Sequence, residues 1–291
     1  MILSDNTKGI VAMCTAMAAF TLNDAMMKLV TETMPLMQAI AIRGALSIAG
    51  LLVLGCVMGG LRFRLAPRDR RMVGLRTVAE MGATLAFLAA LTQMPLANLS
   101  AIMQALPLAV TLAAAVFLGE KVGWRRMAAI AVGFAGVLLI VRPGAAGFDV
   151  WSLLGLVSVA FVVMRDLVTR AFAAALPTVL VSLFSAVAVT AMGAVGVVAS
   201  GVWHPVGGPD AARLALASGA LMLGYVSSVQ AMRQGDVAMV APFRYTMLVW
   251  ATLLGWGLFG TLPDLWTWAG AALVVASGLF TLWRERRVAR A

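Results

Sequence analysis

The stretch LANLSAIMQALPLAVTLAAAVFLGEKVGWRRMAAIAVGFAGVLLIVRP, residues 96–143, decides the fold. It is a long apolar run, a short polar hinge (GEKVGWRR) and a second apolar run. The stretch VAMVAPFRYTMLVWATLLGWGLFGTLPDLWTWAGAALVVASGLFTLWRERR, residues 237–287, has the same pattern. An offset of about 141 positions aligns Gly119 with Gly260. The hinge of the second copy is one residue longer, so the offset is about 142 for the residues after the hinge. An internal repeat of this length sets the architecture of the whole chain.

The repeat also extends upstream of these two stretches. The offset of about 142 positions aligns three further pairs: Asp24 with Asp166, Lys28 with Arg170, and Pro35 with Pro177. We therefore divide the chain into a first repeat at 9–143 and a second at 151–283, with an N-terminal segment at 1–8 and a basic tail at 284–291.

The composition is that of a polytopic membrane protein. Of 291 residues, 62% are hydrophobic and only 12% are charged, whereas an ordinary soluble domain is about a quarter charged. A membrane span needs about 20 mostly apolar residues. On this criterion we predict ten spans, at 9–30, 35–59, 72–93, 97–118, 124–141, 151–172, 177–200, 211–233, 237–259 and 264–283.

An odd number of spans in each repeat has a geometric consequence. The second repeat must begin on the opposite side of the membrane, so the two halves are inverted. Inverted repeats are a building plan of secondary transporters, which hold the substrate near the bilayer midplane. We predict an all-α integral membrane fold of ten transmembrane helices, arranged as two inverted five-helix repeats around a central cavity.

The net charge of +10 reflects membrane topology. Arginines gather in the connection at 60–71 and in the C-terminal tail, and basic segments next to spans mark the cytoplasmic side. We expect a multi-pass protein of a bacterial inner membrane, with both termini cytoplasmic. The lipid bilayer, with its anionic headgroups, is the expected partner of this charge, and no nucleic-acid partner is expected. The sequence leaves open whether the protein forms a homodimer.

Charged side chains inside the spans are the best guide to function, because each costs roughly 2.5–3.5 kcal/mol at a helix centre and needs a partner or a cavity. Asp24 and Lys28 are four residues apart on one face of the first span, and Arg43 lies at a similar depth on the second. An ion pair of Asp24 with Arg43 or with Lys28 is therefore predicted. The alternatives are a purely structural pair and, for Lys28, a side chain that snorkels to the interface.

A second group of charged residues belongs to the inner half of the membrane. Glu80 on the third span, Arg165 and Asp166 on the sixth, and Arg244 and Tyr245 on the ninth lie at comparable depths. Glu80 or Asp166 is expected to neutralise Arg244. A structural ion pair weighs about equally with a functional cluster.

The repeat connects the two groups. Asp24 and Asp166 are equivalent positions, so inversion places one near the outer mouth and the other near the inner mouth. The two clusters, with Arg165 in the inner one, are predicted to act as alternating gates. Asp24, Glu80 and Asp166 are the carboxylates within the spans, so a coupling proton, if there is one, is expected to bind one of them.

Polar side chains on the fourth and ninth spans are candidates for substrate contact. Gln104 and Tyr245 are equivalent under the repeat and would face the cavity if their helices line it. Pro107 and Pro242 loosen the same helices and free backbone carbonyls that a ligand could use.

Catalysis and metal binding are not indicated by the residue types present. The single His204 lies in a connection with no set of metal ligands around it, and Cys14 and Cys56 lie in apolar runs, where a cysteine behaves as a small hydrophobe. An enzyme would need a nucleophile with a base, or a metal centre. We expect no enzyme activity, no metal and no cofactor. A purely structural membrane protein is the other alternative, but it has no need to bury so many charges.

Several further features carry a resemblance to a known family. They are the two five-span repeats, Pro35 and Pro177 at the start of the second and seventh spans, Arg43, and the FLGEKVGWRR turn at 117–126 followed by a Gly-rich span ending in Arg142-Pro143. The chain resembles the drug/metabolite transporter superfamily and, within it, the ten-helix EamA type, over nearly its whole length. The second copy of the turn, Phe259-Gly260-Thr261-Leu262, departs from the usual Gly-Glu.

The resemblance implies a basket of helices around a cavity that opens to one side at a time. Helices three, four, eight and nine usually line that cavity, which would bring in Glu80, Gln104, Tyr225 and Arg244. Members of the superfamily carry amino acids, amines, sugars, nucleotide-like cofactors and riboflavin, so membership alone names no cargo.

We therefore expect a secondary active transporter that moves a small polar or zwitterionic, amino-acid-like metabolite by alternating access. Arg244 and Arg43 would receive its carboxylate, and Gln104 and Tyr245 would hydrogen-bond it. The alternative is an uptake transporter for a vitamin or cofactor such as riboflavin or S-adenosylmethionine. The cargo, the direction of transport and the driving ion are not fixed by the sequence.

Overall fold

A computed structural model describes residues 5–57, 67–120, 122–143, 149–170, 178–234 and 237–289. In these ranges every regular element is a helix: α1 (Asp5–Val30), α2 (Leu36–Val57), α3 (Pro67–Gln93), α4 (Leu96–Met103), α5 (Leu106–Leu118), α6 (Trp124–Val141), α7 (Val150–Arg170), α8 (Thr178–Ser200), α9 (Gly208–Gln234), α10 (Val237–Val240), the 3-10 helix η1 (Ala241–Tyr245), α11 (Thr246–Phe259) and α12 (Leu265–Ala289). The basic connection at 60–71 lies mostly outside the described ranges, as do Pro177, Lys121 and the last two residues of the tail.

These elements form the ten predicted spans, and the all-helical membrane fold is confirmed. In the described part of the chain, 9 segments are long and apolar enough to cross a membrane. The remaining span, at 237–259, is divided into α10, η1 and α11. The fourth span is also bent, because α4 ends at Met103 and α5 begins at Leu106. Pro107 lies in the first turn of α5 and Pro242 in the first turn of η1, where a missing N–H is tolerated.

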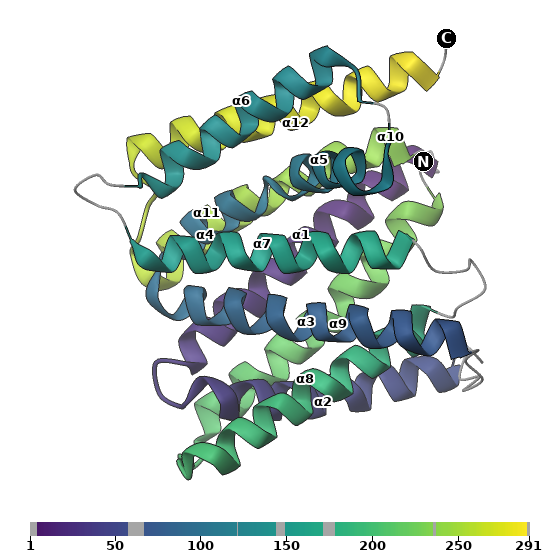
Figure 1. Cartoon of the computed structure of the whole chain (residues 1–291). Helices are drawn as coiled ribbons and strands as arrows, with labels where there is room; N and C mark the ends of the chain where they lie inside the picture. The colour runs from purple at the N-terminus through teal and green to yellow at the C-terminus, as the bar shows by residue number, and fades with distance from the viewer. Residues whose placement is uncertain are drawn as a thin grey trace.

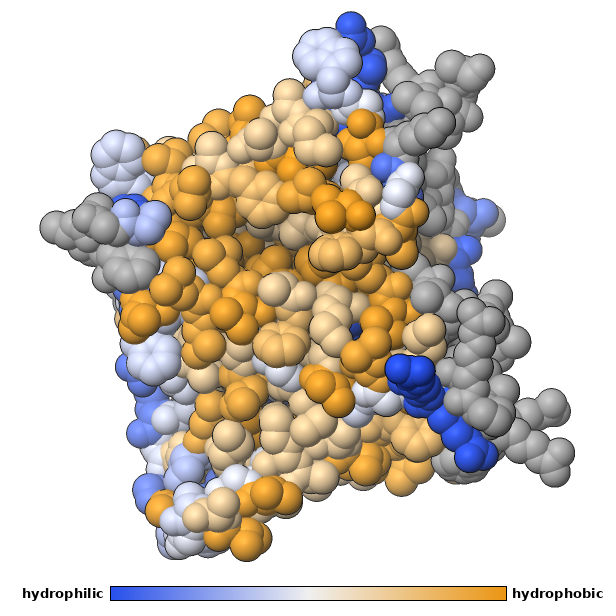
Figure 2. All heavy atoms as spheres, in the orientation of Figure 1, coloured by the Kyte–Doolittle hydropathy of each residue, from blue (hydrophilic) through white to orange (hydrophobic). Residues whose placement is uncertain are grey.

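The outside of the bundle has the polarity pattern of a membrane protein. Figure 2 shows a broad apolar band across the middle of the molecule, with hydrophilic residues gathered along its two edges. The helices run between these edges, and both termini lie at the same edge (Figure 1). Such a band buries apolar side chains in lipid and leaves the connections in the interfacial regions.

Helix packing follows the predicted repeat. α2 packs on α8, α6 on α12 and α4 on α11, so that each of these spans meets its own counterpart (Figure 1). α1 packs on α9 and α3 on α7, two contacts that the repeat exchanges with each other. This is the packing expected of two halves related by a two-fold axis.

Small residues let α6 and α12 approach closely. A Cβ atom placed on Gly136 would lie 2.7 Å from the carbonyl oxygen of Gly270, and one on Gly270 would lie 2.5 Å from the carbonyl oxygen of Gly136. Backbone atoms cannot move aside as flexible side chains do. The crossing therefore requires glycine on both helices, as is common where membrane helices touch.

An ion pair joins α6 and α12 again at the edge of the bundle opposite the termini. Arg142 ends α6 in a left-handed conformation (φ 49°) and contacts the Asp264 carboxylate. Asp264 also accepts a hydrogen bond from the backbone N–H of Thr267 (2.9 Å), which caps α12. Partial burial raises the pKa of Asp264, but the hydrogen bonds from Arg142 and Thr267 outweigh burial and hold that pKa at about 2. The carboxylate is therefore charged at any physiological pH.

Candidate functional site

A polar hollow opens inside the bundle between α2, α3, α8 and α9. Its cavity volume is about 70 Å³. The charged and hydroxyl-bearing side chains that line it are Arg43, Ser47, Arg76, Glu80, Thr84, Ser182, Ser185 and Tyr225. Charged groups in a span are expensive unless they meet partners or a wet cavity. This concentration of them is what distinguishes the hollow from the apolar surface around it.

Arg43 is the last member of a short series of hydrogen-bonded side chains, and one of its N–H groups has no partner among the described residues. Its side chain is 8% exposed, and its Nη1 donates to the Asn23 side-chain oxygen at 3.3 Å. The Asn23 amide nitrogen donates to Asp24 Oδ1 at 2.8 Å. A guanidinium has five N–H groups, and within the described residues the buried Arg43 Nε has no hydrogen-bond partner. Buried donors rarely stay unsatisfied, so Arg43 has the features of an anion receptor.

Ser47 extends this receptor along the same helix. It lies four residues after Arg43 on α2, which places both on one face, and both line the hollow. The Ser47 hydroxyl is buried and, among the described residues, also has no hydrogen-bond partner. Arg43 and Ser47 therefore each bring to this part of α2 a buried polar atom that has no partner among the described residues.

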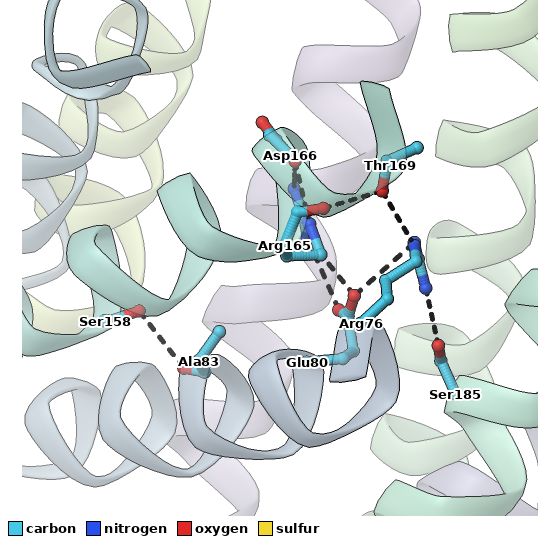
Figure 3. A network of polar contacts seen from close by, with 8 residues as sticks. All are labelled: Arg76, Glu80, Ala83, Ser158, Arg165, Asp166, Thr169 and Ser185. Atoms are coloured by element: carbon cyan, nitrogen blue, oxygen red, sulfur yellow. Dashed lines mark hydrogen bonds and ion pairs between the residues drawn. The ribbon is translucent and has the colours of Figure 1, made fainter. Parts of the chain in front are cut away.

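A network of ion pairs and hydrogen bonds joins α3, α7 and α8 beside the hollow (Figure 3). Glu80 faces two arginines: Arg165 Nη1 lies 3.4 Å from Glu80 Oε2, and Arg76 Nη2 lies 3.7 Å from the same oxygen. Arg165 also holds the carboxylate of its neighbour Asp166 at 2.9 Å. The network ties α3 to α7 through charge.

Hydroxyl groups complete the network around Arg76. Its Nη1 donates to Ser185 Oγ on α8 at 2.6 Å, and its Nε donates to Thr169 Oγ1 on α7 at 3.1 Å. The Thr169 hydroxyl in turn donates to the Arg165 carbonyl oxygen at 2.7 Å. One arginine side chain therefore holds three helices together next to the hollow (Figure 3).

The predicted ion pairs of the outer group are wrong in their geometry. Asn23 stands between Asp24 and Arg43, so the two charges are linked through an amide rather than directly. Lys28 turns away from Asp24, and its Nζ donates to the carbonyl oxygens of Leu91 (2.7 Å) and Met94 (2.9 Å) at the end of α3. The last carbonyls of a helix have no partner within it, and a lysine is a favourable cap for them.

Residues of the fourth and ninth spans lie apart from the hollow. Gln104 is buried at the break between α4 and α5, where its amide nitrogen has no hydrogen-bond partner among the described residues. Tyr245 packs on α12, with its hydroxyl in the space that a side chain at position 278 would fill. Arg244 is exposed on η1, so the expectation that Glu80 or Asp166 neutralises it is wrong: their partners are Arg165 and Arg76.

Arg76 is the member of the site that sequence reasoning missed. The signal was present, since Arg76 lies four residues before Glu80 within a predicted span, a spacing that puts a cation and an acid on one helical face. Tyr225, by contrast, was predicted and does line the hollow, where its ring meets Phe20 edge to face with centroids 5.6 Å apart.

Metal ligation finds no support in the described part of the chain, where no three His, Cys, Asp or Glu side chains lie together in a metal-binding group. The hollow instead offers guanidinium, hydroxyl and phenol groups. These bind polar organic groups by charge and hydrogen bonds.

An all-helical membrane bundle with a charged internal hollow defines a membrane transporter. The chain belongs to the EamA-like transporter family of the drug/metabolite transporter superfamily, whose family model matches residues 7–142. It is 31% identical over 208 residues to a riboflavin transporter of Rhizobium johnstonii, covering 69% of this chain and 67% of the relative. It is 27% identical to an S-adenosylmethionine uptake transporter of Rickettsia felis over 68% of this chain and 66% of the relative.

Two further similarities cover nearly the full length. The chain is 26% identical over 282 residues to a pseudopaline exporter of Pseudomonas aeruginosa, covering 95% of this chain and 96% of that one. It also superposes on a crystal structure with a TM-score of 0.66 and 24% identity, covering 97% of this chain and 99% of the other. That likeness supports the fold alone. The relatives include both uptake and export proteins.

Proposed function

We propose that the protein is a secondary active transporter that moves a small polar or zwitterionic, amino-acid-like metabolite across a bacterial inner membrane by alternating access. The observation that carries the proposal is that Arg43 and Ser47 both line the hollow, and that the buried Nε of Arg43 and the buried hydroxyl of Ser47 have no hydrogen-bond partner among the described residues. A substrate carboxylate would complete both groups. Charge-assisted hydrogen bonds of this kind are roughly twice as strong as neutral ones.

The other lining residues have assigned places in this proposal. Glu80 and Tyr225 face the same hollow and contact the remaining polar part of the substrate. Gln104 and Tyr245 stay predicted contacts on the two interrupted spans, where each has a buried polar atom with no partner in the described residues. Arg244 stays a predicted contact on η1 beside them.

Gating is assigned to the network in Figure 3. The ion pair of Glu80 with Arg165 joins α3 to α7, and Arg165 in turn holds Asp166. These charges are partly buried, so separating α3 from α7 requires water or substrate to take over as partners. Asp24 occupies the equivalent position in the other half. We propose that both termini are cytoplasmic, which places the network in the inner half of the membrane.

A second candidate is uptake of a vitamin or cofactor such as riboflavin or S-adenosylmethionine. It is favoured by the printed functions of the two relatives from Rhizobium johnstonii and Rickettsia felis. The aromatic ring of Tyr225 at the hollow is compatible with a flat cargo. The first candidate requires a carboxylate at Arg43 and Ser47; S-adenosylmethionine also carries one, whereas riboflavin does not, so riboflavin is the cargo that separates the two candidates.

Ligand-induced thermal stabilisation of the purified protein separates the two, because a compound that binds only the folded state raises the melting temperature. The panel contains L-amino acids, the matching α-carboxamides, which keep the amino group and lack the carboxylate charge, riboflavin and S-adenosylmethionine. We expect amino acids to stabilise and the matching amides to fail. Stabilisation by riboflavin with no amino-acid response would support the second candidate, and equal stabilisation by acid and amide would refute the carboxylate receptor.

Substitutions at Arg43 test whether the stabilisation by amino acids depends on the hollow. Arg43→Gln and Arg43→Lys should both lose this response, since a lysine cannot reproduce the fork of a guanidinium. Arg213→Gln is the control, because it removes an arginine charge from the bundle, here one paired with Asp210 at 2.9 Å, at a position near the start of α9 and away from the hollow. Loss of the response in the Arg213 variant would show that the effect is not specific to the site.

A further inference from the structure

The three carboxylates within the spans have different partners. Asp166 receives two donors from Arg165, Nε and Nη2, each at 2.9 Å. Glu80 lies between Arg165 and Arg76, at 3.4 and 3.7 Å. Both carboxylates are therefore paired directly with guanidinium groups.

Asp24 is held differently. Asp24 is 8% exposed, and its carboxylate accepts a hydrogen bond from the neutral side-chain amide of Asn23, which is 3% exposed. Within the described residues, no Lys or Arg nitrogen lies within 4.0 Å of the Asp24 carboxylate. A buried carboxylate without a directly paired cation gains more from binding a proton than a paired one does.

Five elements pack on α1: α3, α9, α10, η1 and α11. α10 and α11 have no titratable groups within their sequences. The sequences of the other three contain the following: Arg68, Asp69, Arg70, Arg71, Arg76 and Glu80 on α3, Asp210, Arg213, Tyr225 and Arg233 on α9, and Arg244 and Tyr245 on η1. On α1 itself, Lys28 is committed to the carbonyls at the end of α3. Arg43 is the cation linked to Asp24, and the link runs through Asn23.

We infer that Asp24 is the carboxyl group that binds a coupling proton, and that Asn23 transmits its charge state to Arg43. The inference rests on the proposed transport function and deepens it by naming the driving ion. With Asp24 ionised, Asn23 is oriented by it and presents its oxygen to Arg43. When Asp24 takes up one proton its negative charge disappears, and the Arg43 charge is left to be balanced by the substrate carboxylate. Proton and carboxylate then bind together.

The repeat supports this division of roles. The offset that aligns Asp24 with Asp166 also aligns Asn23 with Arg165. The same position therefore places an amide beside the acid in one half and a guanidinium in the other. One half keeps a fixed charge and the other keeps an acid that can change its charge.

Infrared spectroscopy of the protein in liposomes tests the inference with the proton itself as the probe. Ordinary carboxyl groups are already ionised above about pH 5.5, so a protonated-acid band that titrates between about pH 5.5 and 8.5 reports a perturbed one. We expect such a band in the wild type, its loss in Asp24→Asn, and its retention in Asp166→Asn and Glu80→Gln. Asp24→Glu should keep the band at the position of a glutamic acid, which controls for a folding defect in Asp24→Asn.

Two outcomes would overturn the assignment: a wild type in which no carboxyl titrates in this range, or a titration that persists unchanged in Asp24→Asn. Neither depends on the identity of the substrate. The thermal panel at a single pH tests the carboxylate receptor separately, so a protein that binds amino acids but shows no titrating band would refute the inference and keep the proposed function.

Discussion

Glu80 provides the most direct test of the network in Figure 3. Its replacement by Gln keeps the shape and removes the charge. At an effective dielectric constant of 20, unit charges 3.4 and 3.7 Å apart attract by about 4.9 and 4.5 kcal/mol. Much of this is offset by the cost of desolvating three charged groups, so the net loss on substitution is far below the sum.

The contacts that remain after the substitution set the expected magnitude. Breaking a fully buried ion pair costs roughly 3–5 kcal/mol. Arg165 keeps Asp166, and Arg76 keeps Ser185 and Thr169, so neither cation is left alone. The Glu80 side chain is also 17% exposed. We therefore expect Glu80→Gln to lower the free energy of unfolding by about 2–3 kcal/mol.

Equilibrium unfolding in mixed micelles, followed by tryptophan fluorescence, measures this loss. Asp5→Asn is the matched control, because Asp5 pairs with Lys8 at 3.0 Å but its side chain is 79% exposed, and surface pairs contribute about 0–1 kcal/mol. If Glu80→Gln unfolds like the wild type and like the control, the network does not stabilise the bundle and its assignment as a gate fails.

Three further predictions concern the packing of the spans, each measured by thermal unfolding. Gly136→Ala and Gly270→Ala should each destabilise by roughly 1–3 kcal/mol, since the new methyl group meets backbone, whereas Gly257→Ala, with nothing within 4 Å, should be neutral or stabilising; equal effects at all three would contradict the close crossing. Lys28→Met should cost about 1–2 kcal/mol by leaving the carbonyls at the end of α3 without a donor, and an unchanged melting temperature would show that the lysine is dispensable there. Asp264→Asn should lower stability equally at pH 7 and pH 5. The pKa of Asp264 is about 2, below the ordinary 3.8, so the stability that its carboxylate contributes is complete above about pH 4 and is lost only as the pH falls through about 2. A stability difference between wild type and variant that is already smaller at pH 5 than at pH 7 would refute this.

The spans were predictable because the membrane imposes length and apolarity on each one. α9 (Gly208–Gln234) matches the predicted span 211–233 to within three residues, while α12 continues to Ala289, beyond the predicted residue 283, and α3 begins at Pro67, ahead of the predicted residue 72. The first turns of α3 are rich in arginine. A hydropathy criterion excludes such residues from a span, although the helix itself continues through them into the interface. Helix length and span length are therefore different quantities.

Side-chain partners were harder to predict than helices. Depth along a span can be counted from the sequence at about 1.5 Å per residue, and it brought Glu80 and Arg165 to the same level. Rotation about the helix axis and the choice of neighbouring helix are not contained in that count. Arg244 was assigned to Glu80 on depth alone, but it lies on η1, where it is exposed, and α3 packs mainly on α7 and α8.

The hollow is symmetric in position but not in chemistry. α3 and α9 have the same length and begin 141 positions apart, at 67 and 208 (208 − 67), and α2 and α8 follow the offset of about 142. Five pairs of lining residues correspond across these offsets: Arg43 with Ser185, Gly44 with Ala186, Ser47 with Val189, Glu80 with Leu221, and Thr84 with Tyr225.

All the formal charges of the lining come from the first repeat. Arg43, Arg76 and Glu80 lie on α2 and α3. The lining residues of the second repeat have hydroxyl, aliphatic and phenol side chains. Rotating a bound substrate by the two-fold axis would therefore place its charged end against the second repeat, which has no charged lining residue to balance it. A molecule with one charged end and one less polar end fits such a hollow in a single orientation. Under the proposed function, the two halves exchange roles during transport, and we expect the substrate carboxylate to stay bound to the first repeat.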